Sequence, residues 1–353
     1  MALFEPYNIS RIDRSPGWIE RIPGPYWALA ILLLIMPSLA SDFVLFQIFG
    51  WSFILGMIAL SLMFLAGYGG MVSVAQMSVA GIAGYMVAIF GESAIDQISM
   101  GWPWFVAIPL GVLIAAILAT CVGWLAVRTE GIYTIMITLA IAAAFFYFCR
   151  QNYTVFNGFS GFNGVLPPEL FGVDWRTAVP FYYLCLFWAA LYFLVVLYVS
   201  RSPFGLALQG VRDNPRRMAA LGYNVTAHRV AAYTAASIPA ATGGILLTWQ
   251  SAQISPGTIS IGPAIDILVV AIVGGLRHPI GPFIGAFVYV LLKTFAVDFL
   301  TSLGLSGERF QLIIGLGFLV IVFWSPDGVL GLWEKFRNWQ KRDPLRGQEG
   351  GIE

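Results

Sequence analysis

Residues 102–127 read WPWFVAIPLGVLIAAILATCVGWLAV and contain no charged side chain. A helix needs about 20 consecutive apolar residues to cross the hydrocarbon core of a bilayer, and this run exceeds that length. Lipid offers no hydrogen-bond partners to the backbone, so such a run crosses the membrane as a helix. The stretch therefore predicts a membrane-spanning helix and excludes an ordinary soluble fold.

The composition of the whole chain agrees with this stretch. Of 353 residues, 59% are hydrophobic and only 10% are charged, whereas soluble domains carry about 25% charged residues. Nineteen basic and eighteen acidic residues give a net charge of +1, which excludes the basic excess that a nucleic-acid binder needs. Cys121, Cys149 and Cys185 fall in apolar runs without metal-ligand spacing, so we expect small buried hydrophobic side chains.

The apolar runs predict an all-α, polytopic membrane protein with about ten transmembrane helices. Segments that contain Gly or Pro separate some of them, at 67–70, 101–103 and 277–279, and the eighth is short enough to predict a short or broken helix. The candidate spans are 26–41, 45–66, 72–90, 102–127, 132–149, 178–200, 229–249, 263–276, 280–297 and 309–325.

The basic residues predict the orientation. With the N-terminus in the cytoplasm, fifteen basic residues fall inside and three, Arg150, Arg176 and Arg309, fall outside. Both termini are then cytoplasmic. The predicted organisation is a cytoplasmic segment 1–25, a single transmembrane domain 26–325 and a cytoplasmic tail 326–353, with a periplasmic loop 150–177 and a cytoplasmic loop 201–228.

The first span has a second interpretation. The basic residues 11–21, the apolar run 26–36 and the small residues 38–41 also resemble a cleavable signal peptide. We favour a retained span; cleavage leaves nine spans with the C-terminus still inside.

Few features of the spans suggest catalysis or ion coupling. Two ionisable residues lie within them, Asp266 and Lys293, at similar predicted depth. They either form an intramembrane ion pair or reach the headgroup region separately. The chain has no G-x-x-x-x-G-K-[ST] phosphate loop. The glycines of Gly158–Gly164 lie in an outer loop without the strand–turn–helix setting of a dinucleotide site.

The cytoplasmic loop contains a predicted short helix. Asn214 suits its N-cap, Pro215 its first position and Gly222 the residue past its end. Arg216 and Arg217 lie in the first turn, where the helix dipole disfavours them. The two arginines either contact lipid phosphates or belong to a helix that docks on a partner, with Met218 and Leu221 as a small apolar patch.

Several short motifs follow one another along residues 60 to 330. They are Gly67-Tyr68-Gly69-Gly70 with Val72-Ser73 and Gly81-x-x-Gly84-Tyr85; Arg128-x-x-Gly131-Ile132-Tyr133 with Thr138-Leu139-Ala140; Ser202-Pro203-Phe204-Gly205, Arg212-Asp213-Asn214 and Ala220-Leu221-Gly222; and Ser255-Pro256, Gly274-Gly275 and Gly281-Pro282-x-x-Gly285-Ala286. Each motif is short, but in their order and spacing they resemble the membrane permeases of ABC importers for branched-chain amino acids, a family that includes urea importers.

The resemblance implies a non-catalytic subunit in a bacterial inner membrane, with no cofactor of its own. It implies a second, homologous permease, two cytoplasmic ATPase subunits that use ATP and Mg, and a periplasmic solute-binding protein. It also implies that the loop helix is the coupling helix that receives the motion of the ATPases. The residues assigned to it are Arg212, Asp213, Asn214, Pro215, Arg216, Arg217, Met218, Leu221 and Gly222.

The chain departs from the family pattern at two places. The usual Glu-x-Ala-Ala of the coupling helix is Pro215-Arg216-Arg217-Met218, and a His common in the third span is Gln76. We assign Ser73 and Gln76, with Asn163 of the outer loop, to the translocation pathway. The alternative is that the polar side chains of the third span form hydrogen bonds between helices.

The mostly uncharged spans favour a small neutral or zwitterionic solute, with branched-chain or other neutral amino acids expected first. Urea or a short amide is the near alternative. A stand-alone channel or secondary carrier, and a membrane enzyme, are the alternatives from other classes.

Overall fold

The computed structural model describes residues 24–95, 97–129, 131–169, 172–302 and 315. By their internal contacts the residues form two units, Met1–Asp42 and Phe43–Glu353. The predicted tenth span 309–325 and the cytoplasmic tail 326–353 lie outside the described residues, apart from Gly315.

The first unit contains one described helix, α1 (Gly24–Leu39). It coincides with the first predicted span and is apolar throughout, with Pro37 in its last turn. The hydroxyl of Ser38 donates to the Ile35 carbonyl at 2.7 Å, which is a local contact within the helix. This unit therefore has the helical form expected for the span.

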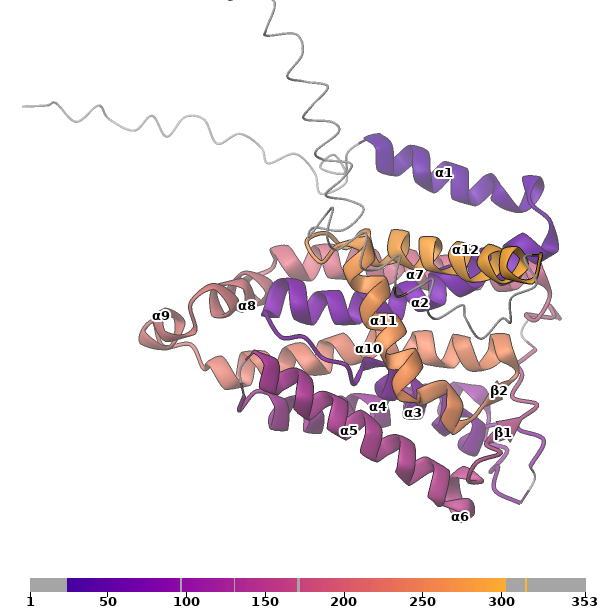
Figure 1. The fold of residues 1–353 in the computed structure, drawn as a ribbon, viewed down its shortest axis with the longest axis horizontal. Coiled ribbons are helices and arrows are strands. Elements are labelled where there is room, and N and C mark those ends of the chain that lie inside the picture. Colours follow the sequence, from indigo (N-terminus) through magenta and orange to yellow (C-terminus); the bar gives the residue numbers. More distant parts are fainter. Residues whose placement is uncertain (1–23, 96, 130, 170–171, 303–314, 316–353) are drawn as a thin grey trace, which may run out of the picture. The chain divides into compact units, whose positions relative to one another are not determined.

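The second unit is almost entirely helical (Figure 1). Its two short strands, β1 (Phe162–Asn163) and β2 (Gln253–Ile254), pair antiparallel with Phe162 opposite Ile254. The helices are η2 (Val44–Gly50), α2 (Trp51–Met63), η3 (Phe64–Tyr68), α3 (Gln76–Phe90), α4 (Trp104–Ala126), α5 (Ile132–Gln151), α6 (Tyr153–Phe156), α7 (Ala178–Arg201), α8 (Pro203–Asp213), α9 (Pro215–Ala220), α10 (Val225–Ser251), η4 (Pro256–Ile259), α11 (Ile261–Gly274) and α12 (Gly281–Ser302).

The elements confirm an all-helical polytopic architecture. Five helices are long and apolar enough to cross a membrane: the continuous helix Val44–Tyr68 formed by η2, α2 and η3, together with α4, α5, α7 and α10. The other predicted spans within the described residues are shorter apolar helices. The described part of the chain therefore supports many spans but does not reach the predicted ten. The predicted short eighth span is α11, with 14 residues.

One predicted boundary is wrong. The third span was expected to begin at residue 72, but α3 begins at Gln76 and residues 71–75 form no regular helix. The apolar run continues through this segment, so hydropathy gives no sign of the interruption. The helix is interrupted because contacts with other helices, described below, hold this segment in a non-helical conformation.

The helices divide into a buried centre and a periphery. In the most apolar 18-residue stretch of Val44–Tyr68, 83% of the residues are buried, whereas in the corresponding stretch of α5 only 22% are buried. The short helix α3 is buried at every position from Gln76 to Ile89. Helix α10 packs against α2, α3 and α4. The centre is therefore formed by α2, α3 and α10, while α4, α5 and α7 expose most of their apolar surface, as expected for helices that face lipid or another subunit.

Small residues allow the central helices to approach closely. A Cβ atom placed on Gly244 of α10 would lie 1.9 Å from the Ala80 carbonyl oxygen of α3, and one on Gly84 would lie 2.3 Å from the Thr248 hydroxyl oxygen. A side chain at Gly244 would therefore force α3 and α10 apart, because the atom it meets belongs to the backbone. Gly81 meets a different neighbour, because a Cβ atom there would lie 1.9 Å from Cγ2 of Ile259 in η4.

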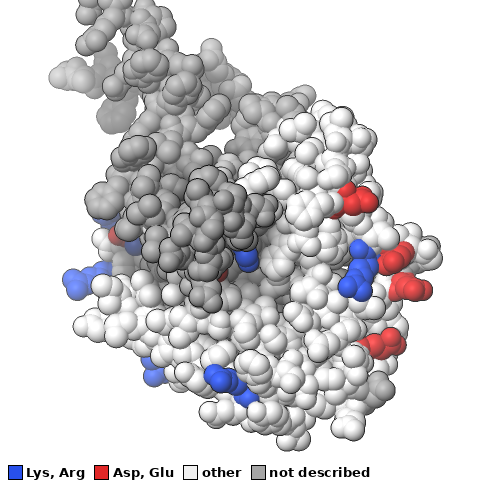
Figure 2. All heavy atoms as spheres, turned by 45° about the vertical axis from the view of Figure 1, so that its right-hand side comes forward, with Lys and Arg blue, Asp and Glu red and all other residues white. Residues whose placement is uncertain are grey.

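The loops gather at two opposite ends of the second unit (Figure 1). At one end β1 pairs with β2, and the Ala94 amide donates to the Asn163 carbonyl at 2.9 Å. At the other end lie α8 and α9. These are the ends that the sequence assigned to the outside and to the cytoplasm. Figure 2 shows that most of the surface turned to the viewer is uncharged, with most of its acidic side chains toward one edge.

The cysteines follow the division between centre and periphery. Cys149 and Cys185 are buried, as predicted. Cys121 is exposed, so its predicted burial is wrong. The reason is that α4 is a peripheral helix, and Cys121 lies on its outward face.

Candidate functional site

The predicted short helix of the cytoplasmic loop is present as α9. The Asn214 side chain accepts a hydrogen bond from the Arg217 amide at 3.0 Å, Pro215 occupies the first helical position, and Gly222 follows the end with φ +89°. These are the N-cap, first-turn and C-terminal signals read from the sequence. Local chemistry is therefore sufficient to define this helix.

Helix α9 has no buried residue. The side chains of Arg216 and Arg217 are exposed, and Leu221 just past the helix is 67% exposed. Met218 does not join Leu221 in one patch, because its thioether packs toward Gly210 of α8. The exposed apolar surface is instead formed by Leu221 and Tyr223, and Tyr223 was not selected from the sequence.

Helix α8 holds α9 against the rest of the protein. Leu208 and Val211 on α8 are fully buried, and the Ser202 hydroxyl caps the helix by accepting from the Gly205 amide at 3.3 Å. Its last turn carries Arg212, whose Nε lies 2.9 Å from the Asp213 carboxylate. The Nη1 of Arg212 also donates to the Gly67 carbonyl at the end of η3. Arg212 and Asp213 therefore lie where the exposed segment meets the second span.

The segment Met71–Ala75 separates η3 from α3 inside the protein. Ser73 is fully buried, and the Val74 amide donates to the Thr138 hydroxyl of α5 at 3.2 Å. Helix α3 then begins at Gln76 without a side-chain cap. The Ser61 hydroxyl donates to the Gln76 side-chain oxygen at 3.0 Å. Gln76 thus forms a hydrogen bond between the second and third spans, as the alternative interpretation expected.

The three predicted pathway residues do not share one environment. Ser73 and Gln76 are enclosed at the helix break, with 0% and 1% of their surface exposed. Asn163 lies on β1, opposite Gln253, and its side chain is exposed. The structure therefore brings Ser73 and Gln76 together but leaves Asn163 at the outer end.

Asp266 and Lys293 lie on neighbouring helices, α11 and α12. The Asp266 carboxylate interacts with the Tyr289 hydroxyl and, through its charge, with Lys293. The Lys293 Nζ lies 5.8 Å from the centre of the Trp51 ring. An ion pair within 4.0 Å is seen between Arg212 and Asp213, whereas a pair between Asp266 and Lys293 stays a prediction.

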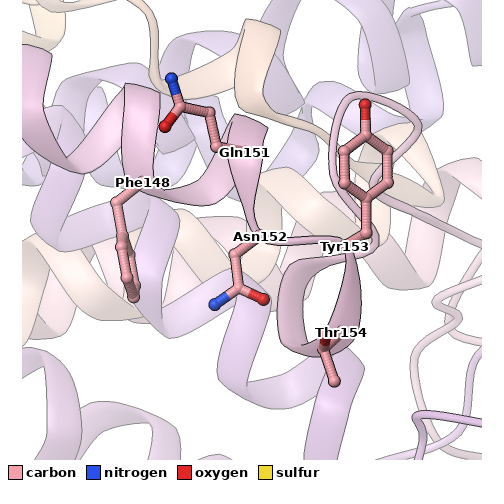
Figure 3. A pocket seen from close by; sticks show the side chains of 5 residues that line it. All are labelled: Phe148, Gln151, Asn152, Tyr153 and Thr154. Atoms are coloured by element: carbon pink, nitrogen blue, oxygen red, sulfur yellow. The ribbon is translucent and has the colours of Figure 1, made fainter.

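A surface hollow lies at the outer end of α5, where the chain turns into α6 (Figure 3). The side chains of Gln151 and Tyr153 point to one side of the chain, whereas those of Phe148, Asn152 and Thr154 point to the other. Asn152 is the N-cap of α6 and accepts from the Val155 amide at 3.0 Å. The hollow has no charged lining residue, and nothing in the sequence singled it out.

Comparison with known proteins adds the family. Residues 44–322 match the family model described as the branched-chain amino acid transport system permease component. The chain is 21% identical over 296 residues to the high-affinity branched-chain amino acid transport system permease protein LivM of Salmonella typhimurium, and 22% identical to that of Escherichia coli. Each alignment covers 77% of this chain and 65% of the relative.

Archaeal relatives are similar too. The probable branched-chain amino acid transport permease protein LivM of Methanocaldococcus jannaschii is 23% identical over 74% of this chain and 80% of its own length. The probable LivH protein of the same organism is 29% identical over 40% of this chain and 45% of its own length. No solved structure gives a significant match.

The matched region begins at the first residue of η2 and includes the helix break, α8, α9 and the close contact between α3 and α10. It covers well over half of the chain. The chain is therefore a multi-pass inner-membrane protein and a non-catalytic subunit. It belongs to the family of branched-chain amino acid transport system permease components.

Proposed function

We propose that this chain is the membrane-spanning permease subunit of an ATP-driven importer. The observation that carries the proposal is α9, a capped helix that, with the adjoining Leu221, exposes Arg216 and Arg217 at the end of the protein that the sequence assigns to the cytoplasm. Apart from Met218, which packs toward Gly210 of α8, the side chains of this helix are not held by the core of the chain. Its exposed side chains are suited to a groove on a cytoplasmic partner, and the proposed partner is one of two ATPase subunits.

The complex proposed for this chain contains four kinds of component: this permease, a second homologous permease, two ATPase subunits that bind ATP and Mg, and a periplasmic solute-binding protein. The similarity to relatives named LivM and to one named LivH supports a pair of related permeases. Closure of the ATPases would then move the permeases between inward-open and outward-open states.

The proposed solutes are small and neutral or zwitterionic, with branched-chain and other neutral amino acids first. The names of the relatives support this choice. The composition of the described spans also supports it, because Asp266 and Lys293 are opposite in sign and Asp266 already interacts with Tyr289. Urea or a short amide is the alternative, since it also needs no charged pathway.

Ser73 and Gln76 remain proposed pathway residues, with Asn163 at the outer end. Their burial and the bond between Ser61 and Gln76 support a structural role in this conformation. Both roles are compatible if the helix break opens during transport.

Co-purification tests the proposal. The tagged chain is extracted from its native membrane in mild detergent, co-purifying proteins are identified, and ATP hydrolysis is assayed with and without candidate solutes and their binding protein. We expect a second permease and ATPase subunits with measurable hydrolysis. A chain that emerges alone, and that moves solute in vesicles without ATP, would be a stand-alone facilitator.

A further inference from the structure

The second span ends in an unusual helix cap. The π-helical turn η3 places one extra residue in the last turn, and Gly70 then adopts φ +68°. In a Schellman cap the Gly70 amide would bond to the Gly67 carbonyl and the Met71 amide to the Ala66 carbonyl, whereas in the simpler αL cap the Gly70 amide bonds to Ala66. Here the Gly70 amide donates to the Ala66 carbonyl at 3.2 Å, as in the αL cap, and the Met71 amide donates to the Leu65 carbonyl at 3.0 Å. Both bonds reach one residue further back than in a Schellman cap, and neither uses the Gly67 carbonyl.

Arg212 of α8 forms a hydrogen bond with this carbonyl. Its Nη1 donates to the Gly67 oxygen, so a cation lies at the negative end of a helix. The side chain also packs on the turn itself, because a Cβ atom on Gly70 would lie 2.7 Å from the Arg212 Cγ. The cap of the second span is therefore completed by a residue 145 positions away.

The same arginine adjoins the exposed helix. Arg212 is followed by Asp213 and then by Asn214, whose side chain caps α9 and whose amide donates to the Gly210 carbonyl of α8 at 3.0 Å. Any displacement of α9 acts on the last turn of α8, where Arg212 lies. Gly67, which accepts the hydrogen bond from Arg212, also packs against the turn after α11, because a Cβ atom on Gly67 would lie 2.2 Å from the Leu276 carbonyl oxygen.

After the cap at Gly70, the chain continues into the buried, non-helical segment Met71–Ala75 between η3 and α3. Gly69 packs near Leu208 of α8, and the next residues, Met71–Ala75, lead directly to the uncapped start of α3. Helix α3 is enclosed by its neighbours along its length, so a shift of its first turn cannot be absorbed by solvent-exposed fraying.

We propose that Arg212 is the positioning residue that links the α8–α9 segment to the break between η3 and α3. Through its bond to Gly67, movement of α9 changes the conformation of Gly69–Ala75 and, with it, the start of α3. The inference deepens the proposed function and rests on it for the source of the movement. The link itself is a property of this chain alone.

The first arm of the test therefore uses the purified chain in nanodiscs without partners. Hydrogen–deuterium exchange is measured for residues 68–75 in the native chain and in Arg212→Gln. We expect exchange in this segment to rise about tenfold, within the range of a coupling between sites. Arg128→Gln is the control, because Arg128 stacks on Trp124 with 4.0 Å between its guanidinium carbon and the ring centre, at the same end of the protein.

Two further variants separate the link from general damage. Arg212→Lys keeps a cation that can donate to one carbonyl, so we expect partial rescue. Gly70→Ala puts a methyl group against Arg212 and strains a residue at φ +68°. We therefore expect amide exchange in residues 68–75 to rise as much as in Arg212→Gln, although the charge of the protein is unchanged. Unchanged exchange in Arg212→Gln would overturn the link, whatever Gly70→Ala shows, because Gly70 lies within the measured segment.

The second arm uses the assembled importer and measures leucine uptake per ATP hydrolysed. We expect Arg212→Gln to retain its ATPase partners while uptake per ATP falls about tenfold. Loss of the partners would make Arg212 a docking residue and overturn the inference, as would normal uptake per ATP. If the native chain has no ATPase partner, the proposed function fails, while the exchange arm still reports on the link.

Discussion

Two short helices of this protein, α3 and α9, are formed for opposite reasons. Helix α9 has six residues, none buried, and is capped at both ends by its own sequence. Helix α3 has 15 residues, is buried from Gln76 to Ile89 and has no side-chain cap at its start. One helix is defined by local hydrogen bonds and the other by its neighbours. Each therefore fails under a different kind of substitution.

The largest expected effect is on the packing of α3. Gly244→Leu would place side-chain atoms against the Ala80 carbonyl, where even a Cβ atom lies 1.9 Å away. We expect α3 and α10 to separate and the protein to lose about 3 kcal/mol of stability. The measurement is the fraction that stays monodisperse in detergent after heating.

The matched control for Gly244→Leu is Gly262→Leu in α11, because a Cβ atom there meets nothing within 4 Å. Equal loss of stability in the two variants would show that the contact between α3 and α10 is not the cause.

The next effect is on transport and leaves the fold intact. Leu221→Asp replaces the most exposed apolar side chain near α9 with a charge. If Leu221 is buried in an ATPase groove, the uncompensated carboxylate costs a few kcal/mol there, and we expect uptake to be abolished while the protein is still inserted. Leu221→Met keeps the apolar surface and should transport normally. Normal solute-stimulated ATP hydrolysis in Leu221→Asp would refute the coupling role of α9.

Removal of the local cap has a smaller effect. Asn214→Ala deletes the side chain that accepts from the Arg217 amide, which costs about 1 kcal/mol of helix stability. We expect amide exchange in α9 to rise about fivefold, which corresponds to that energy. Asn224→Ala makes the same change at the start of α10, where the side chain accepts from Ala227, and should leave α9 unchanged. No change in α9 with Asn214→Ala would mean that packing on α8 holds it.

The smallest effect is at the start of α3. The bond between Ser61 and Gln76 joins two buried side chains, and such bonds contribute about 0.6 kcal/mol in membranes. A double-mutant cycle of Ser61→Ala and Gln76→Leu, followed by thermal stability, measures this coupling. If the two substitutions have additive effects on stability, the hydrogen bond between Ser61 and Gln76 does not contribute to stability. A changed solute KM in Gln76→Leu at unchanged stability would favour the pathway role.

The same contrast explains what could be read from the sequence. Asn214, Pro215 and Gly222 carry the signals for α9 in a single stretch, so the helix was predicted with its caps. The division into apolar helices was equally direct, because hydropathy reports on each segment alone. The start of α3 was missed because residues 72–90 are mostly apolar and carry no charge, and the break depends on Thr138, 64 positions from Val74.

Two features of the site needed the fold. The bond from Arg212 to Gly67 joins residues 145 positions apart, and no spacing rule relates them. The π-helical turn that leaves the Gly67 carbonyl available has no sequence signature of its own. By contrast, the Gly69-Gly70 and Gly274-Gly275 pairs belong to the short motifs that carried the family resemblance, and Gly70 and Gly275 adopt positive φ at helix ends.

Photo-crosslinking from position 221 tests the central claim most directly. A photoreactive amino acid replaces Leu221 in the native membrane, and Leu113, which is 56% exposed on the apolar face of α4, is the control position. Our account predicts a crosslink from position 221 to an ATPase subunit and none from position 113 to that subunit. Crosslinks from position 221 to lipid alone, or to another copy of this chain, would contradict it.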